Sequence, residues 1–286
     1  MTRVGTADHP QARTGRALAR WYAANGRHDL PWRATRDRWL VLVSEVMLHQ
    51  TQVPRVAAVF DAFIAEFPTP AATAAAGPAA VITAWGRLGY PRRARWLWEA
   101  AVRITEAGWP ADLSELPGVG RYTAAAVAAQ VDDEDRVGIE VNIRRVCERV
   151  RGEGLTDTEA EACVREIARG LRPRDRLLAT MDLGATVCTA RSPACDVCPI
   201  VAACATRGTH DHETKHRQAR FEGSFRQRRG IVMAQLRAGS VAASEVDGEV
   251  LASLLDDGLA EVTRGRAHLP RPPRRGSSPG AGARRS

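Results

Sequence analysis

Four cysteines in the second half of the chain are spaced closely enough to bind one metal centre. Six, two and five residues separate them, and they are Cys188, Cys195, Cys198 and Cys204. Prolines at 193 and 199 prevent the segment from forming one regular helix, so four thiolates from a short irregular loop can surround one compact centre. This pattern suits a four-cysteine iron–sulfur cluster. Zinc is the alternative, but zinc sites usually pair two short Cys-x2–4-Cys knuckles and this segment has only one.

A glycine-containing turn further upstream is suited to contact a phosphate oxygen. Between Leu116 and Val127, Pro117 ends a short helix, and Gly118 and Gly120 permit a tight turn with close backbone approach. A helix begins directly afterwards, so several backbone N–H groups face outward at its N-terminus. A lone Gly-x-Gly is more often an ordinary turn between helices, so the phosphate-binding interpretation depends on the rest of the chain.

One glutamate lies in a stretch that is otherwise mostly apolar. Glu45 is part of residues 41–48, and burial there would raise the pKa of its carboxyl group. A carboxyl that stays neutral near pH 7 can donate a proton to a leaving group. An exposed helical glutamate is the alternative, and these residues alone favour it.

The charge of the chain favours a nucleic-acid partner. The sequence has 41 Lys plus Arg against 33 Asp plus Glu, a formal net charge of +8, which attracts a phosphate backbone. No run of about 18 apolar residues predicts a membrane span, and residues 1–10 do not resemble a signal peptide. We therefore expect a cytoplasmic, nucleoid-associated protein. Its cysteines would then be reduced, which favours a metal centre over disulfides.

The elements that must position these residues are mostly helices. Hydrophobic periodicity predicts an all-α domain, with helices at 13–24, 39–49, 53–66, 94–107, 121–130, 141–150 and 158–169. Cys147 and Cys163 stand alone in these helical patterns and are expected to be small buried hydrophobes. Beyond residue 225, two helices at 226–236 and 244–257 precede a small hairpin, which is a winged-helix pattern.

Five segments follow from this organisation. We predict a helical domain at 10–187, a cluster loop at 188–204, a linker at 205–225, a small winged-helix-like module at 226–269 and a disordered basic tail at 270–286.

Several motifs together resemble one family of DNA repair enzymes. The string LPGVGR at 116–121 resembles the helix–hairpin–helix of DNA glycosylases, and the cysteine loop resembles that of the endonuclease III and MutY family. The strings LPWR at 30–33, SEVMLHQT at 44–51, LGY at 88–90 and MDLGA at 181–185 resemble the adenine-removing MutY branch. The resemblance covers residues 30–204. It implies an all-α helix–hairpin–helix glycosylase fold, a 4Fe–4S cluster and duplex DNA containing a mispair as partner.

The resemblance also assigns roles to individual residues. It implies that Glu45 is the catalytic acid, that Asn142 lies near the reacting sugar and that Gln50 wedges into the duplex while the target base is flipped out. Adenine leaves from an oxocarbenium-like sugar, so an acid must protonate the base and a second, ionised carboxylate should offset the sugar's charge. The remaining residues expected to bind DNA are Arg33, Gly118, Gly120 and Arg121.

The second carboxylate departs from the family pattern. The family has an aspartate two residues before the asparagine, whereas this chain has Glu140. One extra methylene matters where a misplacement of about 1 Å can cost roughly 10²-fold. Three interpretations are open: the helix is shifted to compensate, the enzyme is slower, or it serves a different base or damaged nucleotide. Nearby acids at 132, 133 and 135 are expected to form a solvated loop.

The reaction type depends on the residue after the hairpin arginine. Family members that also cut the strand have a lysine there, which forms a Schiff base with the sugar. This chain has Tyr122, and its only lysine, Lys215, lies outside the predicted helical domain. We therefore expect hydrolysis that stops at an abasic site, without lysine-dependent lyase activity.

The C-terminal part is a second departure. Bacterial MutY proteins usually carry a Nudix-like domain that recognises 8-oxoguanine, but only 82 residues follow Cys204. Residues 221–230 and the winged-helix pattern resemble the shortened C-terminus of some high-GC bacterial members. His49, where the family commonly has glutamine, also bears on recognition of the opposite base.

The sequence thus predicts a monomeric, monofunctional glycosylase that removes adenine mispaired with guanine or 8-oxoguanine in base excision repair. A thymine-mismatch glycosylase of the same fold is one alternative, because a tyrosine at the position of Tyr122 also occurs in such enzymes. A DNA-binding iron–sulfur protein with weakened catalysis is the other, because of Glu140.

Overall fold

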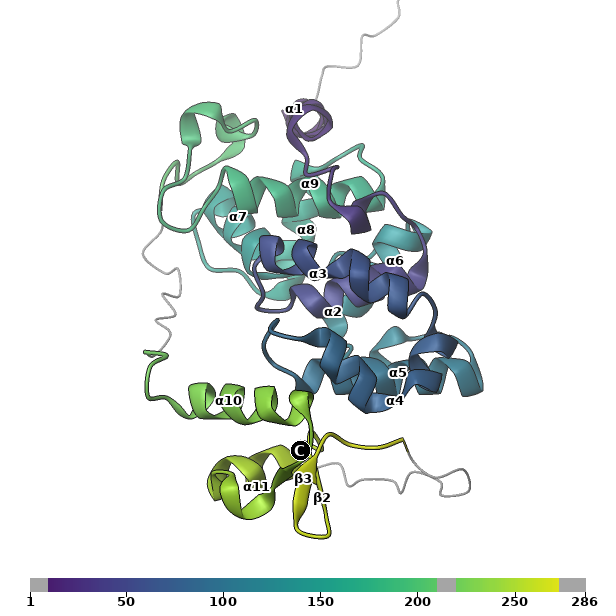
Figure 1. The fold of residues 1–286 in the computed structure, drawn as a ribbon. Helices are drawn as coiled ribbons and strands as arrows, with labels where there is room; N and C mark the ends of the chain where they lie inside the picture. The colour runs from purple at the N-terminus through teal and green to yellow at the C-terminus, as the bar shows by residue number, and fades with distance from the viewer. Residues whose placement is uncertain (1–9, 210–219, 273–286) are drawn as a thin grey trace, which may run out of the picture. The chain divides into compact units, whose positions relative to one another are not determined.

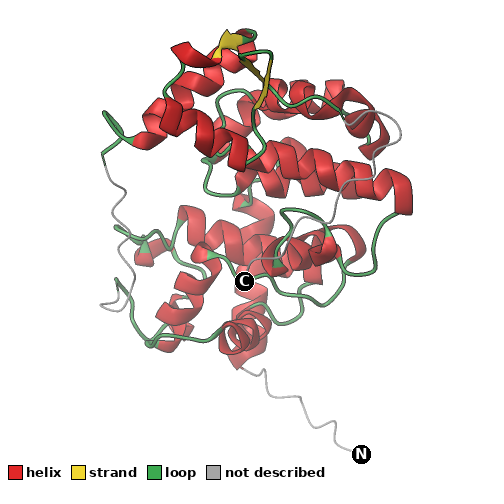
Figure 2. Cartoon of the chain, turned by 90° about the horizontal axis from the view of Figure 1, so that it is seen from below, coloured by secondary structure: helices red, strands yellow, loops and turns green. Residues whose placement is uncertain are grey.

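Helices form nearly all the regular structure of the chain (Figures 1 and 2). The computed structural model describes residues 10–209 and 220–272. Its helices are α1 (Pro10–Asn25), α2 (Arg38–Leu48), α3 (Val53–Glu66), α4 (Pro70–Trp85), α5 (Arg92–Ala107), α6 (Arg121–Asp132), α7 (Val141–Arg151), α8 (Asp157–Ile167), α9 (Pro173–Thr186), α10 (Phe225–Ala238) and α11 (Gly248–Asp256). The strands are β1 (Val241–Ala242), β2 (Glu261–Thr263) and β3 (Arg266–His268), paired antiparallel in the order β1-β3-β2.

The chain divides into two compact units, each built from separate stretches of sequence. The first comprises Met1–Val46, Asp112–Glu115 and Val119–Arg217, and the second comprises Met47–Ala111, Leu116–Gly118 and Gln218–Ser286. The segment boundaries predicted from the sequence stay a prediction. Residues 210–219 of the predicted linker and 273–286 of the predicted tail lie outside the described residues, as do residues 1–9.

Helices α6 to α9 pack together in the first unit, and α1 contacts α8 and α9. Their shared core is apolar and includes Leu18, Ile143, Cys147, Cys163 and Leu183, each fully buried. The prediction that the two lone cysteines are buried hydrophobes is therefore confirmed. Close contact between α7 and α9 depends on Gly184, because a Cβ there would lie 2.6 Å from the backbone oxygen of Asn142.

In the second unit, α4 packs against α5, and α10 contacts α4, α11 and β3. The two helices and the hairpin predicted after residue 225 are present, and they are joined by the short strand β1, which the sequence did not predict. This part buries its own apolar residues, among them Val232, Leu236, Val250, Leu254 and Ala267.

The helix predictions before residue 170 are confirmed to within a few residues, but two helices were missed. Helix α4 is rich in alanine and breaks at Gly77, whose φ of 82° is non-helical, so it lacks one continuous apolar stripe. Helix α9 is buried on nearly every side, with Leu177, Leu178 and Asp182 all inside. A helix without an exposed face has no amphipathic period to detect.

No helix in residues 10–209 or 220–272 is long and apolar enough to cross a membrane.

Candidate active site and metal centre

Glu45 lies inside the first unit, on the last turns of α2. Only 5% of its surface is exposed, and its neighbours Val43 and Val46 are also buried. Burial raises the pKa of the Glu45 carboxyl above its ordinary value. Hydrogen bonds from Gln130 and Tyr122 and the positive charge of Arg33 oppose that shift without cancelling it. The sequence alone favoured an exposed glutamate, and the structure instead places this carboxyl where it can hold a proton.

Glu140 caps the N-terminus of α7 with its side chain. One carboxylate oxygen, Oε1, accepts a hydrogen bond of 2.9 Å from the backbone N–H of Ile143. The other, Oε2, accepts one of 2.9 Å from Nδ2 of Asn142. Burial raises the pKa of Glu140, while these donors and the charge of Arg145 act in the opposite direction. Both oxygens are thus held at the positive end of a helix dipole.

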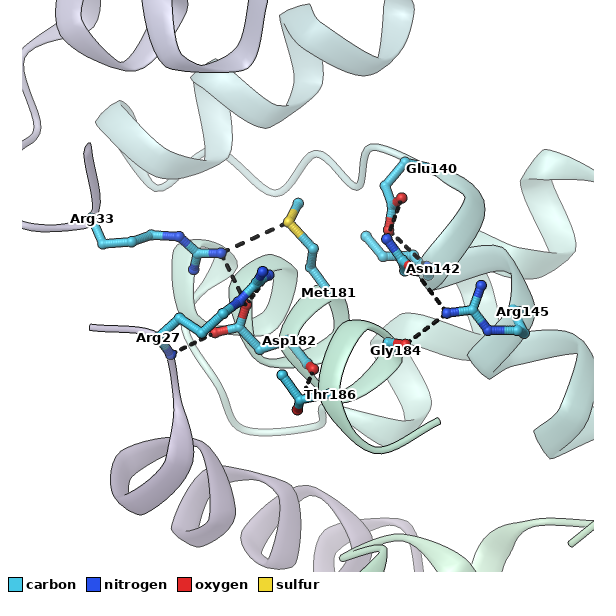
Figure 3. Close-up of polar contacts among 10 residues, drawn as sticks. Arg27, Arg33, Glu140, Asn142, Arg145, Met181, Asp182, Gly184 and Thr186 are labelled. Carbon is cyan, nitrogen blue, oxygen red and sulfur yellow. Dashed lines mark hydrogen bonds and ion pairs between the residues drawn. The ribbon is translucent and has the colours of Figure 1, made fainter. Parts of the chain in front are cut away.

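Asn142 is fixed from two sides (Figure 3). Besides donating to Glu140, its Oδ1 accepts a 2.7 Å hydrogen bond from Nη2 of Arg145. The same Nη2 donates to the backbone oxygen of Gly184 at 2.6 Å, and Nε donates to that of Cys188 at 2.8 Å. Arg145, which is buried, therefore links the helix start that carries Glu140 to the first cysteine of the cluster loop.

Tyr122 interacts with both glutamates. Its hydroxyl is hydrogen-bonded to Glu45. Burial and the negative charges of Glu45 and Glu140 raise the pKa of Tyr122 well above its ordinary value, so the phenol stays neutral. Its ring packs so closely on Gly138 that a Cβ at that position would lie 2.8 Å from the ring.

Arg33 is held by a buried carboxylate (Figure 3). Asp182, which is fully buried, accepts from Nη2 of Arg33 at 3.0 Å and from Nη2 of Arg27 at 2.6 Å. The positive charge of Arg33 in turn opposes, without cancelling, the rise in the pKa of both Glu45 and Tyr122. The predicted residues Arg33, Glu45, Tyr122, Glu140 and Asn142 thus come together in one unit.

Sequence reasoning missed four supporting residues: Arg27, Gln130, Arg145 and Asp182. Asp182 was inside the quoted MDLGA string, so its position was noted but its charge was not used. Arg27 and Gln130 have no local signal, because their partners lie far away in the sequence. Arg145 contacts the nearby Asn142, but its other partners, Gly184 and Cys188, are distant in sequence. Asp132, the last residue of α6, pairs with Arg38, and the acids that follow it, Asp133 and Asp135, pair with Arg36 and Arg176.

The two hairpin glycines, Gly118 and Gly120, differ in backbone conformation and in the space around them. Gly118 has a φ of 74°, and a Cβ there would lie 2.8 Å from Trp96, so both conformation and space require glycine. Gly120 is the residue before α6 and has a φ of −93°, with no atom within 4 Å of a built Cβ. Open space in front of this helix start leaves room for a ligand atom, and Arg121 beside it is exposed.

Gln50, the predicted wedge, belongs to the second unit. It is exposed and has a φ of 51°, which is uncommon for a residue with a side chain. Arg93 supports this loop by donating to the backbone oxygen of Met47 at 3.2 Å and to Oγ1 of Thr51 at 3.0 Å. Strained backbone positions of this kind cluster at functional sites.

The four cysteines of the loop line one small pocket, together with Arg149. Nη1 of Arg149 donates to Sγ of Cys188 at 3.3 Å, and the backbone N–H of Arg207 donates to Sγ of Cys204 at 3.4 Å. Burial, with a smaller contribution from the other three cysteines, raises the pKa of the Cys198 thiol to about 11. Within residues 10–209 and 220–272, no three His, Cys, Asp or Glu side chains are placed so that they could hold a single metal ion. Four cysteines around one pocket, with N–H donors to the sulfurs of Cys188 and Cys204, are a ligand set suited to an iron–sulfur cluster.

Comparison with known proteins agrees with this geometry. Residues 43–171 match the HhH-GPD superfamily of base excision DNA repair proteins, and residues 188–204 match the iron–sulfur binding domain of endonuclease III. Among solved structures, a thermostable thymine-DNA glycosylase has a TM-score of 0.62 at 25% identity, over 69% of this chain and 96% of the other. A non-covalent endonuclease III–DNA complex has a TM-score of 0.57 at 20% identity, over 67% and 92%, and shows the fold alone.

Two curated relatives cover more of the chain. An adenine DNA glycosylase of Mycolicibacterium smegmatis is 41% identical over 272 residues, which are 86% of this chain and 92% of that protein. That of Mycobacterium tuberculosis is 40% identical over 88% and 92%. A thymine/uracil-DNA glycosylase of Pyrobaculum aerophilum is 35% identical over 64% of this chain and 86% of that protein. With its buried carboxylates, its cysteine pocket and these relatives, the chain belongs to the adenine DNA glycosylase family of the helix–hairpin–helix base excision repair proteins.

Proposed function

We propose that this protein removes adenine mispaired with guanine or 8-oxoguanine from duplex DNA, by hydrolysis of the N-glycosidic bond. The observation that carries the proposal is the pair of glutamates with different surroundings. Glu45 is buried and resists ionisation, whereas Glu140 is bound by donors at a helix N-terminus. Cleavage of an adenine nucleoside needs both a proton donor for the base and a negative charge beside the sugar.

In the proposed mechanism, Glu45 donates its proton to the flipped adenine as the glycosidic bond breaks. The ionised Glu140 then offsets the positive charge that develops on the sugar, and Asn142 keeps that carboxylate in place. Water adds to the sugar, and Glu45, now ionised, can accept its proton. Arg33 is held by Asp182 near the carboxyl group that gives and takes this proton.

The local geometry of Glu140 supports accommodation of the extra methylene by the side chain itself, in place of the helix shift named above. A glutamate is not a preferred N-cap residue, since Asp, Asn, Ser and Thr reach the helix start more readily. Glu140 nevertheless accepts from the N–H of Ile143 and from Asn142. Its longer side chain is therefore folded back onto the helix, which favours compensation over a loss of the carboxylate's role.

We infer that the enzyme has no lysine-dependent lyase activity. The neutral hydroxyl of Tyr122 occupies the position where a Schiff-base lysine would be needed, and the sole lysine, Lys215, lies outside the described residues. Borohydride should trap no covalent adduct with DNA through a lysine, and strand cleavage should require added alkali. Efficient trapping would point to another amine.

Cys188, Cys195, Cys198 and Cys204 would hold the iron–sulfur cluster as a 4Fe–4S centre. When bound, the cluster supplies a four-point anchor that fixes the loop. Arg149 contributes from α7 by donating to Cys188 and to the backbone oxygen of Thr189. Purified protein should contain about four irons per chain, and stoichiometric zinc without iron would contradict the assignment.

The experiment that tests the function uses three duplexes and an alkaline step. Purified protein is incubated with A·8-oxoG, A·G and T·G duplexes, and alkali then reveals abasic sites. We expect cleavage at the adenine of the first two duplexes and none at T·G. Cleavage of T·G alone would favour a thymine glycosylase, and tight binding without any cleavage would favour a DNA-binding protein with weakened catalysis. We also infer that the protein acts as a monomer in the nucleoid.

A further inference from the structure

A buried glutamine contacts the carboxyl group of Glu45 and has no place in the mechanism above. Gln130 lies near the C-terminal end of α6, and only 1% of its surface is exposed. Its Nε2 is 2.7 Å from Oε1 of Glu45. Burial of an amide away from water is costly unless the amide is hydrogen-bonded, and Glu45 is the partner that this side chain reaches.

The backbone of Gln130 is also fixed. Its carbonyl oxygen accepts a hydrogen bond from Nη1 of Arg174. The same guanidinium contacts the backbone oxygens of Arg33 and Thr35, so α9 ties the end of α6 to the segment that carries Arg33. The amide of Gln130 therefore approaches Glu45 from an anchored position, and its N–H fixes one of the two carboxyl oxygens.

This contact determines which oxygen can carry the acid proton. Oε1 accepts from Gln130, so a neutral Glu45 that keeps this hydrogen bond must be protonated on Oε2. If the amide were turned around, Oε1 would donate its proton to the glutamine, and that proton would face the protein core. Only the first arrangement leaves the proton on Oε2, the carboxyl oxygen that does not contact Gln130.

We propose that Gln130 is a positioning residue that holds the acid proton of Glu45 on Oε2, where it is delivered to the leaving base. The inference rests on the proposed function of Glu45. Four groups face the Glu45 carboxyl: Gln130 and Tyr122 of α6, the cation Arg33, and the anion Glu140. The amide of Gln130 is uncharged, so it orients the carboxyl group without adding a competing charge to the site.

The test is a double-mutant cycle of Gln130→Met and Glu45→Gln, measured as single-turnover adenine release from an A·8-oxoG duplex. Methionine keeps the length of the side chain and removes its donor. In the parent background we expect Gln130→Met to slow release about tenfold, part of the roughly 10²–10⁴ that general acid–base catalysis supplies. In the Glu45→Gln background it should change the rate by less than about twofold, because the residue acts only through Glu45. An equal loss in both backgrounds, or no loss in either, would overturn the proposal.

The pH profile adds a readout that a purely structural role would not move. The hydrogen bond from Gln130 lowers the pKa of Glu45, so its removal raises that pKa and keeps the acid protonated to higher pH. The alkaline limb of the profile should therefore move to higher pH in Gln130→Met. The control is Thr180→Val, which removes a buried hydroxyl bonded within α9 and should leave the profile in place.

A third measurement separates this inference from the proposed function. The Glu45 carboxyl of the full holoprotein is titrated by carbon-13 NMR and assigned by its absence in Glu45→Gln. Glu45 should titrate at higher pH in Gln130→Met than in the parent even if the parent releases no adenine, which would contradict the proposed function alone. Identical titration curves would overturn the role of Gln130. Gln130→Leu serves as the second variant if the methionine variant does not fold.

Discussion

The end of α2 and the start of α7 each carry a glutamate whose pKa is raised by burial, but the two regions surround that side chain with different partners. Glu45 lies on the last turns of α2 among apolar residues, and its hydrogen-bond donors are the side chains of Gln130 and Tyr122. Glu140 lies at a helix N-terminus and accepts from a backbone N–H and from Asn142. Burial acts on both carboxyls, but the helix N-terminus favours the ionised form only at Glu140. These different partners are the basis for our proposal that Glu45 acts as the proton donor and Glu140 as the fixed negative charge.

The most severe way to break this comparison is Glu140→Asn. Asparagine removes the negative charge that offsets the oxocarbenium ion while it can still cap the helix. We expect adenine release to fall by about 10³ or more in single-turnover assays, with duplex binding retained. The control is Glu148→Gln on the same helix, whose side chain lies 3.9 Å from Arg144 and should not affect release. Release at the parent rate would remove Glu140 from the mechanism.

Arg145→Met tests whether the position of Glu140 depends on Arg145, which holds Asn142 beside it. This change leaves Oδ1 of Asn142 and the backbone oxygens of Gly184 and Cys188 without their donor. Since Asn142 then loses one of its two constraints, we expect release to slow roughly 10²-fold, the scale of a misplacement of about 1 Å. The alkaline limb set by Glu45 should stay at the parent pH, because Arg145 acts on the other carboxylate.

A shift of the alkaline limb of the pH profile in Arg145→Met would show that the surroundings of Glu45 and Glu140 are not independent. Iron content measured on the same preparation distinguishes a local effect from loss of the cluster, since Arg145 also donates to Cys188.

Glu140→Asp should have the smallest effect and sharpens the comparison most. Aspartate keeps the charge and is a better N-cap residue, but it places the carboxylate one methylene closer to the helix. We expect release within about tenfold of the parent, in either direction. A rate above that of the parent would indicate that the glutamate holds the charge too far out. Complete loss would show that the site around α7 is built specifically for the longer side chain.

Sequence reasoning found the parts of the site that depend on local signals. The cysteine spacing, the hairpin turn and Glu45 in its apolar stretch all stand in short strings, and the helices around them are present. The supports of these residues could not be found in this way. Gln130 and Glu45 are 85 positions apart, and Arg33 and Asp182 are 149 apart, so only the folded chain shows that they meet.

The two missed helices have a related cause. Helix α9 supplies Asp182 and Gly184 to the site from the middle of the core. Because it is buried on nearly every side, its sequence carries no amphipathic pattern. The helix that holds Arg33 through Asp182 and Arg145 through Gly184 was therefore not predicted. The cap made by Glu140 was likewise not predicted, since glutamate is an unusual residue at that position.

The most direct test of the account is the pH dependence of single-turnover adenine release in the parent and in Glu45→Gln. A neutral Glu45 and an ionised Glu140 are required together, so the parent profile should be bell-shaped. Its alkaline limb should reflect Glu45, whose pKa is raised by burial. Its acid limb should reflect protonation of Glu140. The account predicts that Glu45→Gln lowers the maximum by at least about 10² and abolishes the alkaline limb. A Glu45→Gln enzyme that keeps both the rate and the alkaline limb of the parent would contradict it.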